Sequence, residues 1–226
     1  MPESLHQVLQ LPAEVDLQLA LTHRSWTEEN PDHQHNERLE YLGDAVLELA
    51  VTELLFTRLP EAAEGDLSRI RSALVRTESL AELARRWALG AHLRLGRGEI
   101  ASGGRDKASL LANAVEAVLG AVFLAAGYPT CRQVLETAFG PTIDAIDDPS
   151  TYGADPKSLL QELTVQRWKV LPRYRELGRE GPAHDLVFTC QVTVGEHVQA
   201  QGQGSSKKAA QRAAARAALE QVGDTS

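Results

Sequence analysis

The segment NERLEYLGDAVLELAV carries acidic side chains at helical spacing, with Glu37, Glu40 and Asp44 at positions i, i+3 and i+7. At about 100° per residue, these positions fall within roughly 60° of one another on a helix. Like charges at such spacing destabilise an isolated helix by roughly a few tenths of a kcal/mol per pair, so a bound cation would relieve them. A solvated acidic face, with Arg38 beside it and Glu48 extending it, accounts for the spacing equally well.

A second pair of polar residues interrupts the apolar stretch LLANAVEAVLGAVFLAAG, residues 110–127. Asn113 and Glu116 lie three residues apart in a segment that is otherwise typical of a buried helix. A carboxylate in such surroundings needs a partner, because burying an unpaired charge is costly. Oxygen ligands without a Cys or His cluster suit Mg²⁺ or Mn²⁺, which can activate water for attack on a phosphate. These residues therefore indicate hydrolysis of a phosphodiester.

The elements that must position these side chains are expected to be helices. From Ala20 to Gly140 the apolar residues recur at helical spacing, and no run alternates convincingly with period two. The pattern predicts helices over residues 14–23, 36–58, 66–74, 77–89, 107–126 and 130–146. Residues 1–146 are therefore expected to form an all-α domain.

A linker and a second module are expected to follow. The segment DDPSTYGADP is rich in Pro, Gly, Ser and Asp, which marks residues 147–154 as a linker. Beyond it, PKSLLQELTVQRW is helix-like, three strands are expected with turns at GREG and VGEH, and SSKKAAQRAAARAALEQV is a strong helix. Residues 155–226 are thus predicted to form a small α+β domain with the order α-β-β-β-α.

The two parts differ in charge as well as in pattern. Residues 1–153 hold 13 basic and 23 acidic side chains, a net charge of −10, whereas residues 154–226 hold 10 and 8, a net charge of +2. The N-terminal segment has no cationic run followed by an apolar one, and the longest apolar stretch is too short to cross a bilayer. Two isolated cysteines support neither a disulfide framework nor a zinc cluster. We expect a soluble, cytoplasmic protein without a membrane partner.

The last predicted helix begins with two lysines, Lys207 and Lys208, directly after a serine pair. Lysines there oppose the helix dipole, whose N-terminal end is already electropositive. Free backbone N–H groups and two ammonium groups together form a site for phosphate oxygens. An ordinary solvated lysine pair is the alternative.

Five segments follow one another along the first 125 residues: LTHRSW, NERLEYLGDAVL, EGDLSRIRSALV, LGRGEIASGG and SLLANAVEAVLGAVFL. In order and spacing they resemble the bacterial ribonuclease III family, the double-strand-specific endoribonucleases. With the C-terminal module, the resemblance covers most of the chain.

The resemblance implies a role for each acidic position. Glu40, Asp44 and Glu116 would bind the catalytic metals, with Asp44 and Glu116 as the acids on which activity most depends. Glu37 and Glu64 match further acidic positions near the cleft. The implied cofactor is Mg²⁺, with Mn²⁺ as a substitute.

The resemblance further implies a symmetric homodimer in which Tyr41 plugs into the partner subunit. Each dimer would carry two cleavage centres. The products from double-stranded RNA would bear 5′-phosphate and 3′-hydroxyl ends with short 3′ overhangs. Ribosomal and other precursor transcripts are the expected substrates.

The C-terminal module resembles the double-stranded RNA-binding domain. Ser158 and Gln161 in its first helix, His184 in the GPAHD turn, and Lys207 and Lys208 match RNA-binding positions. A module of this kind spans roughly 16 base pairs and reads the shape of the duplex more than its sequence.

The chain departs from the family pattern at one position of the proposed metal site. Where the family's second metal motif usually reads Asp-x-x-Glu, this chain has Asn113-x-x-Glu116. An amide oxygen can ligate Mg²⁺ but brings no negative charge. We therefore expect an active enzyme that needs more metal, or tolerates Mn²⁺ better, than a version with aspartate.

Two other functions remain open on the sequence. A double-stranded RNA-binding protein with a degenerate, inactive nuclease domain would explain Asn113, and a structural helical partner protein would need no aligned carboxylates. The Gly-rich segments lack the Gly-Lys-Ser/Thr ending of a P-loop, so no nucleotide cofactor is expected. His33 and His35 lack a third spaced ligand for zinc, and His23 is expected to pack or hydrogen-bond, with a general-base role as the alternative.

Overall fold

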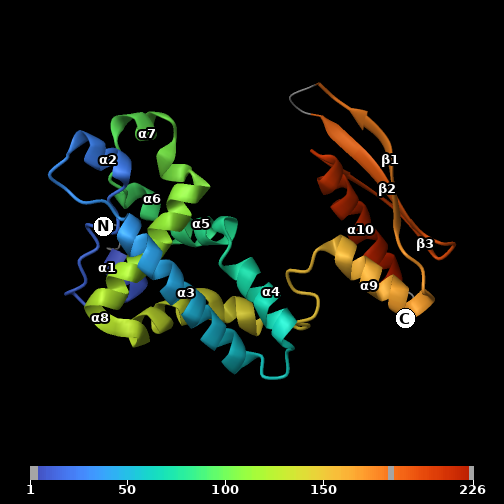
Figure 1. Ribbon diagram of the computed structural model, residues 1–226, viewed down its shortest axis with the longest axis horizontal. Coiled ribbons are helices and arrows are strands. Elements are labelled where there is room, and N and C mark those ends of the chain that lie inside the picture. Colours follow the sequence, from blue (N-terminus) through green and yellow to red (C-terminus); the bar gives the residue numbers. More distant parts are fainter. Residues whose placement is uncertain (1–4, 183–185, 224–226) are drawn as a thin grey trace. The chain divides into compact units, whose positions relative to one another are not determined.

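The computed structural model describes residues 5–182 and 186–223, and the chain divides into two compact units between Tyr152 and Gly153 (Figure 1). The helices of the first unit are α1 (Leu5–Leu9), α2 (Arg24–Glu29), α3 (Glu37–Arg58), α4 (Glu64–Leu74), α5 (Thr77–Arg86), α6 (Leu89–His92), α7 (Arg97–Ala101), the 3-10 turn η1 (Gly104–Asp106) and α8 (Ala108–Asp144). The second unit contains α9 (Pro156–Trp168), β1 (Arg173–Glu180), β2 (Val187–Val194), β3 (Val198–Gly204) and α10 (Lys207–Gly223). The predicted helical domain and α-β-β-β-α module are confirmed, and the division between the units falls within residues 147–154.

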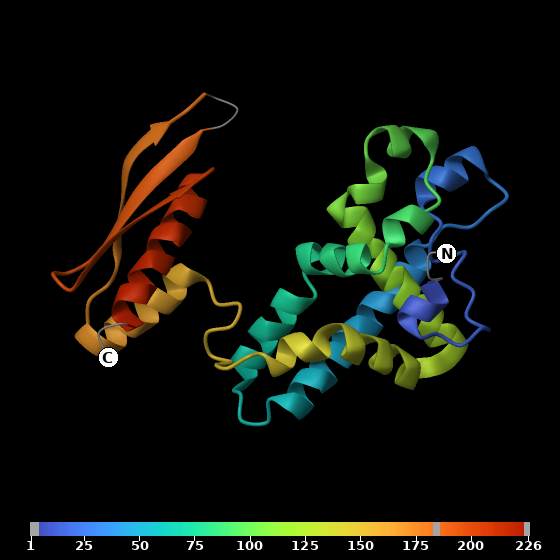
Figure 2. The same cartoon turned by 180° about the vertical axis from the view of Figure 1, so that it is seen from behind.

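The centre of the first unit is made by α3 and α8, which bury leucines such as Leu47, Leu54 and Leu119. At Gly127 the backbone of α8 leaves the helical region, with φ 76° and ψ 175°, and Pro129 follows. This bend confirms the predicted break between residues 107–126 and 130–146. In both views the second half of α8 runs beside the C-terminal half of α3 (Figure 1 and Figure 2).

The apolar character of α8 is explained by its place in the core. Its most apolar window has a mean hydropathy of 1.9, enough by length and composition to cross a membrane, and 61% of that window is buried inside the unit. A helix that is hydrophobic on most of its surface is expected at the centre of a globular unit. The expectation that no apolar stretch is long enough to cross a bilayer is therefore wrong for α8 by length and composition, because the helix continues past the apolar stretch that the sequence pattern singles out. Most of that window is packed against other parts of the unit.

The prediction of a helix over residues 14–23 is wrong. The apolar side chains of Val15, Leu17 and Ala20 are buried, but the backbone forms separate turns. The carboxylate of Asp16 accepts a hydrogen bond from the backbone N–H of Gln18 at 2.8 Å. Local bonds of this kind compete with helix formation, and the actual helix, α2, begins at Arg24.

The second unit is a three-stranded antiparallel sheet with α9 and α10 packed on it. The strand order is β1-β2-β3, with an irregularity in the β1 register between Glu176 and Gly178. A Cβ on Gly202 of β3 would lie 2.1 Å from the backbone nitrogen of Ala214, so α10 approaches the strand closely. Ala214 and Ala218 are fully buried, so the alanines of this helix allow it to pack closely on the sheet.

Candidate functional site: an acidic helix crossing

Two glycines bring α3 and α8 into close contact beside the acidic residues. A Cβ on Gly43 would lie 1.7 Å from the carbonyl oxygen of Glu116, and a Cβ on Gly120 would lie 2.2 Å from the carbonyl oxygen of Leu39. Only residues without a side chain permit such an approach. Because Gly43 directly precedes Asp44, the crossing places the acidic face of α3 against the polar pair of α8.

Asn113 and Glu116 are the partly exposed residues in an otherwise buried segment of α8. From Leu110 to Val122 every residue of α8 is buried except Asn113 and Glu116, which are partly exposed. The spacing of three residues puts both on one face, where α3 crosses. Glu116 is therefore half-buried at the edge of the core rather than fully enclosed in it.

The acidic groups at the crossing perturb one another. The pKa of Glu116 is raised to about 7, first by its partial burial and then by the Asp44 and Glu40 carboxylates. Burial also raises the pKa of Glu40, as do the charges of Glu37 and Asp44, although a side-chain hydrogen bond with Asn113 lowers it. The crossing thus gathers carboxylates that repel one another and has a deficit of positive charge.

The donor set fits a hard divalent cation. Glu40, Asp44 and Glu116 offer carboxylate oxygens and Asn113 an amide oxygen, the ligands that Mg²⁺ and Mn²⁺ prefer. In the side-chain positions observed, no three or more His, Cys, Asp or Glu residues of the described ranges are arranged to hold a metal ion. The carboxylates are near enough to raise the pKa of Glu116, so a shared ion would require their side chains to turn further towards one another.

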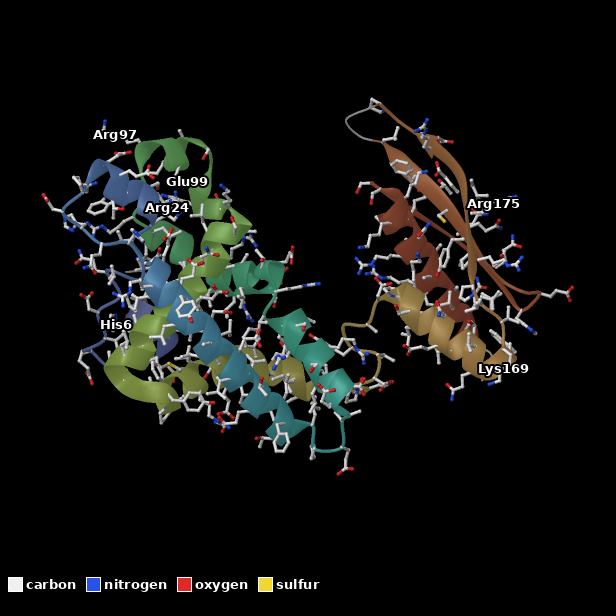
Figure 3. The ribbon with its side chains drawn as sticks, in the orientation of Figure 1. His6, Arg24, Arg97, Glu99, Lys169 and Arg175 are labelled. Atoms are coloured by element: carbon white, nitrogen blue, oxygen red, sulfur yellow. The ribbon has the colours of Figure 1, made fainter. Side chains whose placement is uncertain are left out.

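The N-terminal end of α3 is bordered by basic and polar groups. Glu37, its first residue, pairs with Arg24 at 3.5 Å. Figure 3 shows Arg24, Arg97 and Glu99 at the end of the unit formed by α2 and α7. His23 accepts a hydrogen bond through Nδ1 from the backbone N–H of Ser25 at 3.2 Å and caps α2, and burial lowers its pKa. This favours the hydrogen-bonding role for His23.

Glu64 does not join the acidic crossing within one chain. It begins α4, accepts a hydrogen bond from the Ser68 hydroxyl at 3.0 Å, and lines a cavity of about 240 Å³ with Thr52 and Phe56. Thr52 lies on α3 roughly 12 Å beyond Asp44, at about 1.5 Å of rise per residue. The structure therefore separates Glu64 from the four polar residues at the crossing.

Tyr41 lies on a separate, apolar face of α3. Its side chain is 84% exposed, and the exposed side chains of Leu49 and Phe56 lie within about 80° of it around the helix axis. Exposed apolar side chains gathered on one face are typical of a protein interface. This face adjoins the acidic one, because Asp44 is roughly 60° from Tyr41 on the other side.

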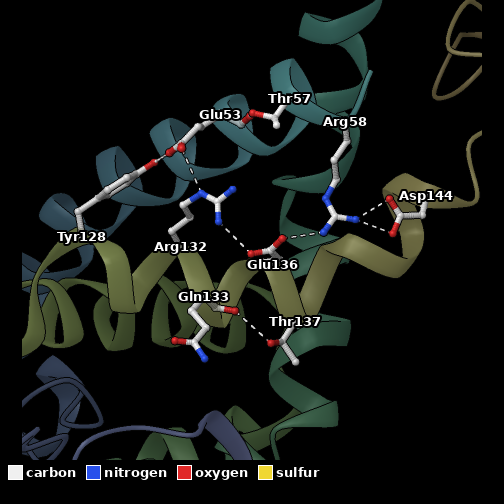
Figure 4. A network of polar contacts seen from close by, with 9 residues as sticks. All are labelled: Glu53, Thr57, Arg58, Tyr128, Arg132, Gln133, Glu136, Thr137 and Asp144. Atoms are coloured by element: carbon white, nitrogen blue, oxygen red, sulfur yellow. Dashed lines mark hydrogen bonds and ion pairs between the residues drawn. The ribbon is translucent and has the colours of Figure 1, made fainter. Parts of the chain in front are cut away.

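A polar network holds the far half of α3 against α8 (Figure 4). The Tyr128 hydroxyl donates to Glu53, and Arg132 binds both Glu53 at 3.1 Å and Glu136 at 2.9 Å. Arg58 extends the network to Glu136 at 2.7 Å and to Asp144. Burial and the hydroxyl bond raise the pKa of Tyr128 to about 12, so it stays protonated. The network thus links the C-terminal half of α3 to the second half of α8.

The sequence pattern did not identify the residues that create the crossing. Gly43 and Gly120 lie inside helices, where glycine is unfavourable. Their presence there could have indicated a close approach between the two helices. Asn36, directly before α3, is 4% exposed and donates through its side-chain amide to the carbonyl of Ala20 at 2.9 Å. It anchors the end of α3 that carries Glu37.

Four of the five residues predicted to bind RNA in the second unit are described, and all four are exposed. Ser158 and Gln161 are exposed on one face of α9, and Lys207 and Lys208 are exposed in the first turn of α10. Ser206 caps α10, because its hydroxyl accepts from the backbone N–H of Ala209 at 3.2 Å. His184 lies outside the described residues.

Comparisons with known proteins cover both units. Residues 14–142 match the Ribonuclease-III-like family model, and residues 156–222 match the double-stranded RNA binding motif. Ribonuclease 3 of Geobacter sulfurreducens is 47% identical over 205 residues, which cover 90% of this chain and 82% of that protein. Ribonuclease 3 of Idiomarina loihiensis is 44% identical over 206 residues, covering 91% and 90%. The solved nuclease domain of the Campylobacter jejuni ribonuclease III has a TM-score of 0.57 at 39% identity, covering 61% of this chain and 94% of that one.

Proposed function

Because the chain belongs to the ribonuclease III family, we propose that it is a divalent-metal-dependent endonuclease that cuts double-stranded RNA. The observation that carries the proposal is the crossing of α3 and α8, where the Asp44 and Glu40 carboxylates help to raise the pKa of Glu116 to about 7. Such mutual repulsion is relieved by a cation, which makes the crossing suited to metal-assisted hydrolysis. An inactive RNA-binding protein or a structural partner would have no use for this arrangement.

The residues at the crossing have two proposed roles. Most of them would bind the metal ion, and Glu37 would position a neighbouring arginine. Glu40, Asp44 and Glu116 would hold Mg²⁺, or Mn²⁺ in its place, and the oxygen of Asn113 would complete the set while its amide group donates to Glu40. When bound, the ion supplies a Lewis acid and an activated water for attack on phosphorus. Glu37, at the edge of the set, orients Arg24 by their ion pair.

The catalytic form is proposed to be a symmetric homodimer built on the apolar face of α3. Tyr41 is its most exposed member and would insert into the partner subunit. Since the acidic and apolar faces are adjacent, the dimer would place each carboxylate cluster at the rim of the interface. Glu64, remote from the crossing in its own chain, could serve catalysis only through the second subunit. The solved nuclease domain of the Campylobacter jejuni ribonuclease III has a region involved in dimer formation.

The second unit is proposed to hold the duplex. Ser158, Gln161, Lys207 and Lys208, together with His184, would contact the 2′-hydroxyl and phosphate groups of the RNA. We assign residues 1–146 to catalysis, 147–154 to the linker and 155–226 to RNA binding. We further propose that the enzyme acts in the cytoplasm on ribosomal and other precursor transcripts. It would need no nucleotide cofactor.

One assay separates this proposal from its rivals. Long duplex RNA is incubated with Mg²⁺ and either the native chain or Glu116→Ala. Metal-dependent shortening that the substitution abolishes supports the enzyme, with 5′-phosphate and 3′-hydroxyl termini and short 3′ overhangs expected on the products. Intact RNA that shifts on a gel would instead indicate an inactive binding protein, and intact RNA without a shift would indicate a structural protein.

A further inference from the structure

One of the two lysines proposed to bind RNA already has a partner in the protein. The Nζ atom of Lys207 lies 2.7 Å from Oε2 of Glu176, and Glu176 belongs to β1, in the sheet beside α10. The lysine side chain is 66% exposed and the glutamate 35% exposed, so RNA can reach both groups. A phosphate that binds Lys207 therefore competes with a carboxylate of this chain for the same ammonium group.

The geometry of β1 explains why Glu176 points towards the lysine. Alternate residues of a strand face the same side, and Tyr174 lies on the side covered by the helices, beneath the Nζ of Lys157 at 4.6 Å. Glu176 has the same parity as Tyr174 and so faces α10. Arg175, between them, lies on the other side of the strand (Figure 3).

The neighbouring cations also bind groups of this chain, and Lys208 differs from them in this respect. Lys157 donates to the Gln211 side chain at 2.7 Å, and Arg212 pairs with Asp155 at 2.8 Å. Lys208 is exposed and forms no ion pair within residues 5–182 and 186–223. Glu176 thus pairs with one of the two lysines in the first turn of α10.

We propose that Glu176 competes with RNA phosphate for Lys207 and so sets the affinity of the C-terminal module for duplex RNA. The proposal rests on the RNA-binding role proposed above for Lys207. When a phosphate oxygen replaces the carboxylate, the carboxylate stays close by and repels the RNA backbone. The chain therefore binds a duplex less tightly and releases it faster than its lysines alone would allow.

The test measures binding of the full chain to a duplex of about 30 base pairs, long enough for a module that spans roughly 16. A chelator keeps the RNA uncut, and affinity is measured at several salt concentrations for the native chain, Glu176→Gln, Lys207→Gln and the double variant. Glu176→Gln is expected to tighten binding about two- to fivefold at low salt. It should also steepen the slope of log K against log salt by up to roughly 0.9, the contribution of one further phosphate contact.

Glu196→Gln is the matched control, because it removes the same charge from the exposed turn between β2 and β3. It is expected to change affinity less than Glu176→Gln. Lys207→Gln should weaken binding more in the Glu176→Gln background than in the native chain. Glu176→Ala, as a second variant, must tighten binding as Glu176→Gln does.

The possible failures are distinguishable. If Lys207→Gln weakens binding but both Glu176 variants bind like the native chain, the competition is wrong while the RNA-binding role of Lys207 stands. If Lys207→Gln changes nothing in either background, that role is wrong and the competition falls with it. If Glu196→Gln tightens binding as much as Glu176→Gln, net charge rather than the ion pair sets the affinity, which also overturns the proposal.

Discussion

Asn113 on α8 faces Glu40 on α3, and its side-chain amide lowers the pKa of a carboxyl that burial and neighbouring charges otherwise raise. An aspartate at the same position would add a fourth carboxylate to Glu40, Asp44 and Glu116. The amide therefore reduces the repulsion among these carboxylates, and in the proposed metal site it brings one negative charge fewer than an aspartate would.

Exchange of the amide for a carboxylate is predicted to change the metal requirement. Asn113→Asp should lower the Mg²⁺ concentration for half-maximal cleavage by up to roughly tenfold, because one more negative charge attracts the ion. Asn113→Ala, which removes the oxygen without adding charge, should raise that concentration. Cleavage is measured across a metal titration, and superimposable curves for the native chain and Asn113→Asp would refute the role assigned to the amide.

The metal-free protein is predicted to lose stability as pH rises through the range in which Glu116 ionises. Its pKa rises from 4.5 to about 7 on folding, so the folded state holds a proton that the unfolded state has lost between these values. The free energy of unfolding contributed by this group therefore falls with rising pH across that window, by at most roughly 3 kcal/mol.

This pH effect is measured by denaturant unfolding in the presence of a chelator. Glu116→Gln, which cannot ionise, should gain stability relative to the native chain between about pH 5 and pH 8. Added Mg²⁺ should stabilise the native chain more at the higher pH. A constant difference between the two proteins over this range would be incompatible with the raised pKa.

The close helix crossing is predicted to depend on Gly43. Gly43→Ala places a Cβ 1.7 Å from the carbonyl oxygen of Glu116, so the helices must separate. We expect a loss of roughly 1–3 kcal/mol in the free energy of unfolding, the usual cost of overpacking, together with a lower cleavage rate. Gly65→Ala is the control, because its Cβ meets nothing within 4 Å and alanine favours the helix, so stability should rise slightly. Equal stability of the two variants would show that α3 and α8 tolerate separation.

The apolar face of α3 is predicted to mediate dimerisation. Tyr41→Arg places a charge on that face and should shift the protein from dimer towards monomer in sedimentation experiments at micromolar concentration. Leu171→Arg alters a side chain that is 58% exposed in the second unit, and it should leave the dimer intact. A Tyr41→Arg protein that sediments as the native one does would remove Tyr41 from the interface.

The sequence predicted the arrangement of the acidic side chains best where one helix supplies neighbouring residues. The period of the apolar side chains located α3 almost to the residue, and the i, i+3, i+7 spacing put Glu37, Glu40 and Asp44 on one face of that helix. The period of the apolar side chains also predicted a helix over residues 14–23, and this was wrong, because the buried apolar residues there lie in turns. Periodicity reports burial, and burial does not require a helix.

Relationships between distant segments could not be predicted in this way. The ion pair of Lys207 with Glu176 joins α10 to β1, and the separation of Glu64 from the crossing depends on where α4 starts. Neither follows from spacing along the chain, because each is set by how the elements pack. The hydrogen bond of Asn113 to Glu40 belongs to the same class.

The joint role of the carboxylates of α3 and α8, which would hold the metal ion that assists RNA hydrolysis, is the centre of the proposed function. Its most direct test is the single-turnover cleavage rate of long duplex RNA at saturating protein and Mg²⁺, with bound RNA measured in parallel, for the native chain and Glu116→Gln. The substitution keeps the shape of the side chain, so RNA binding should stay within about twofold while cleavage falls by roughly 10²-fold or more. Cleavage by Glu116→Gln at the native rate would contradict the account.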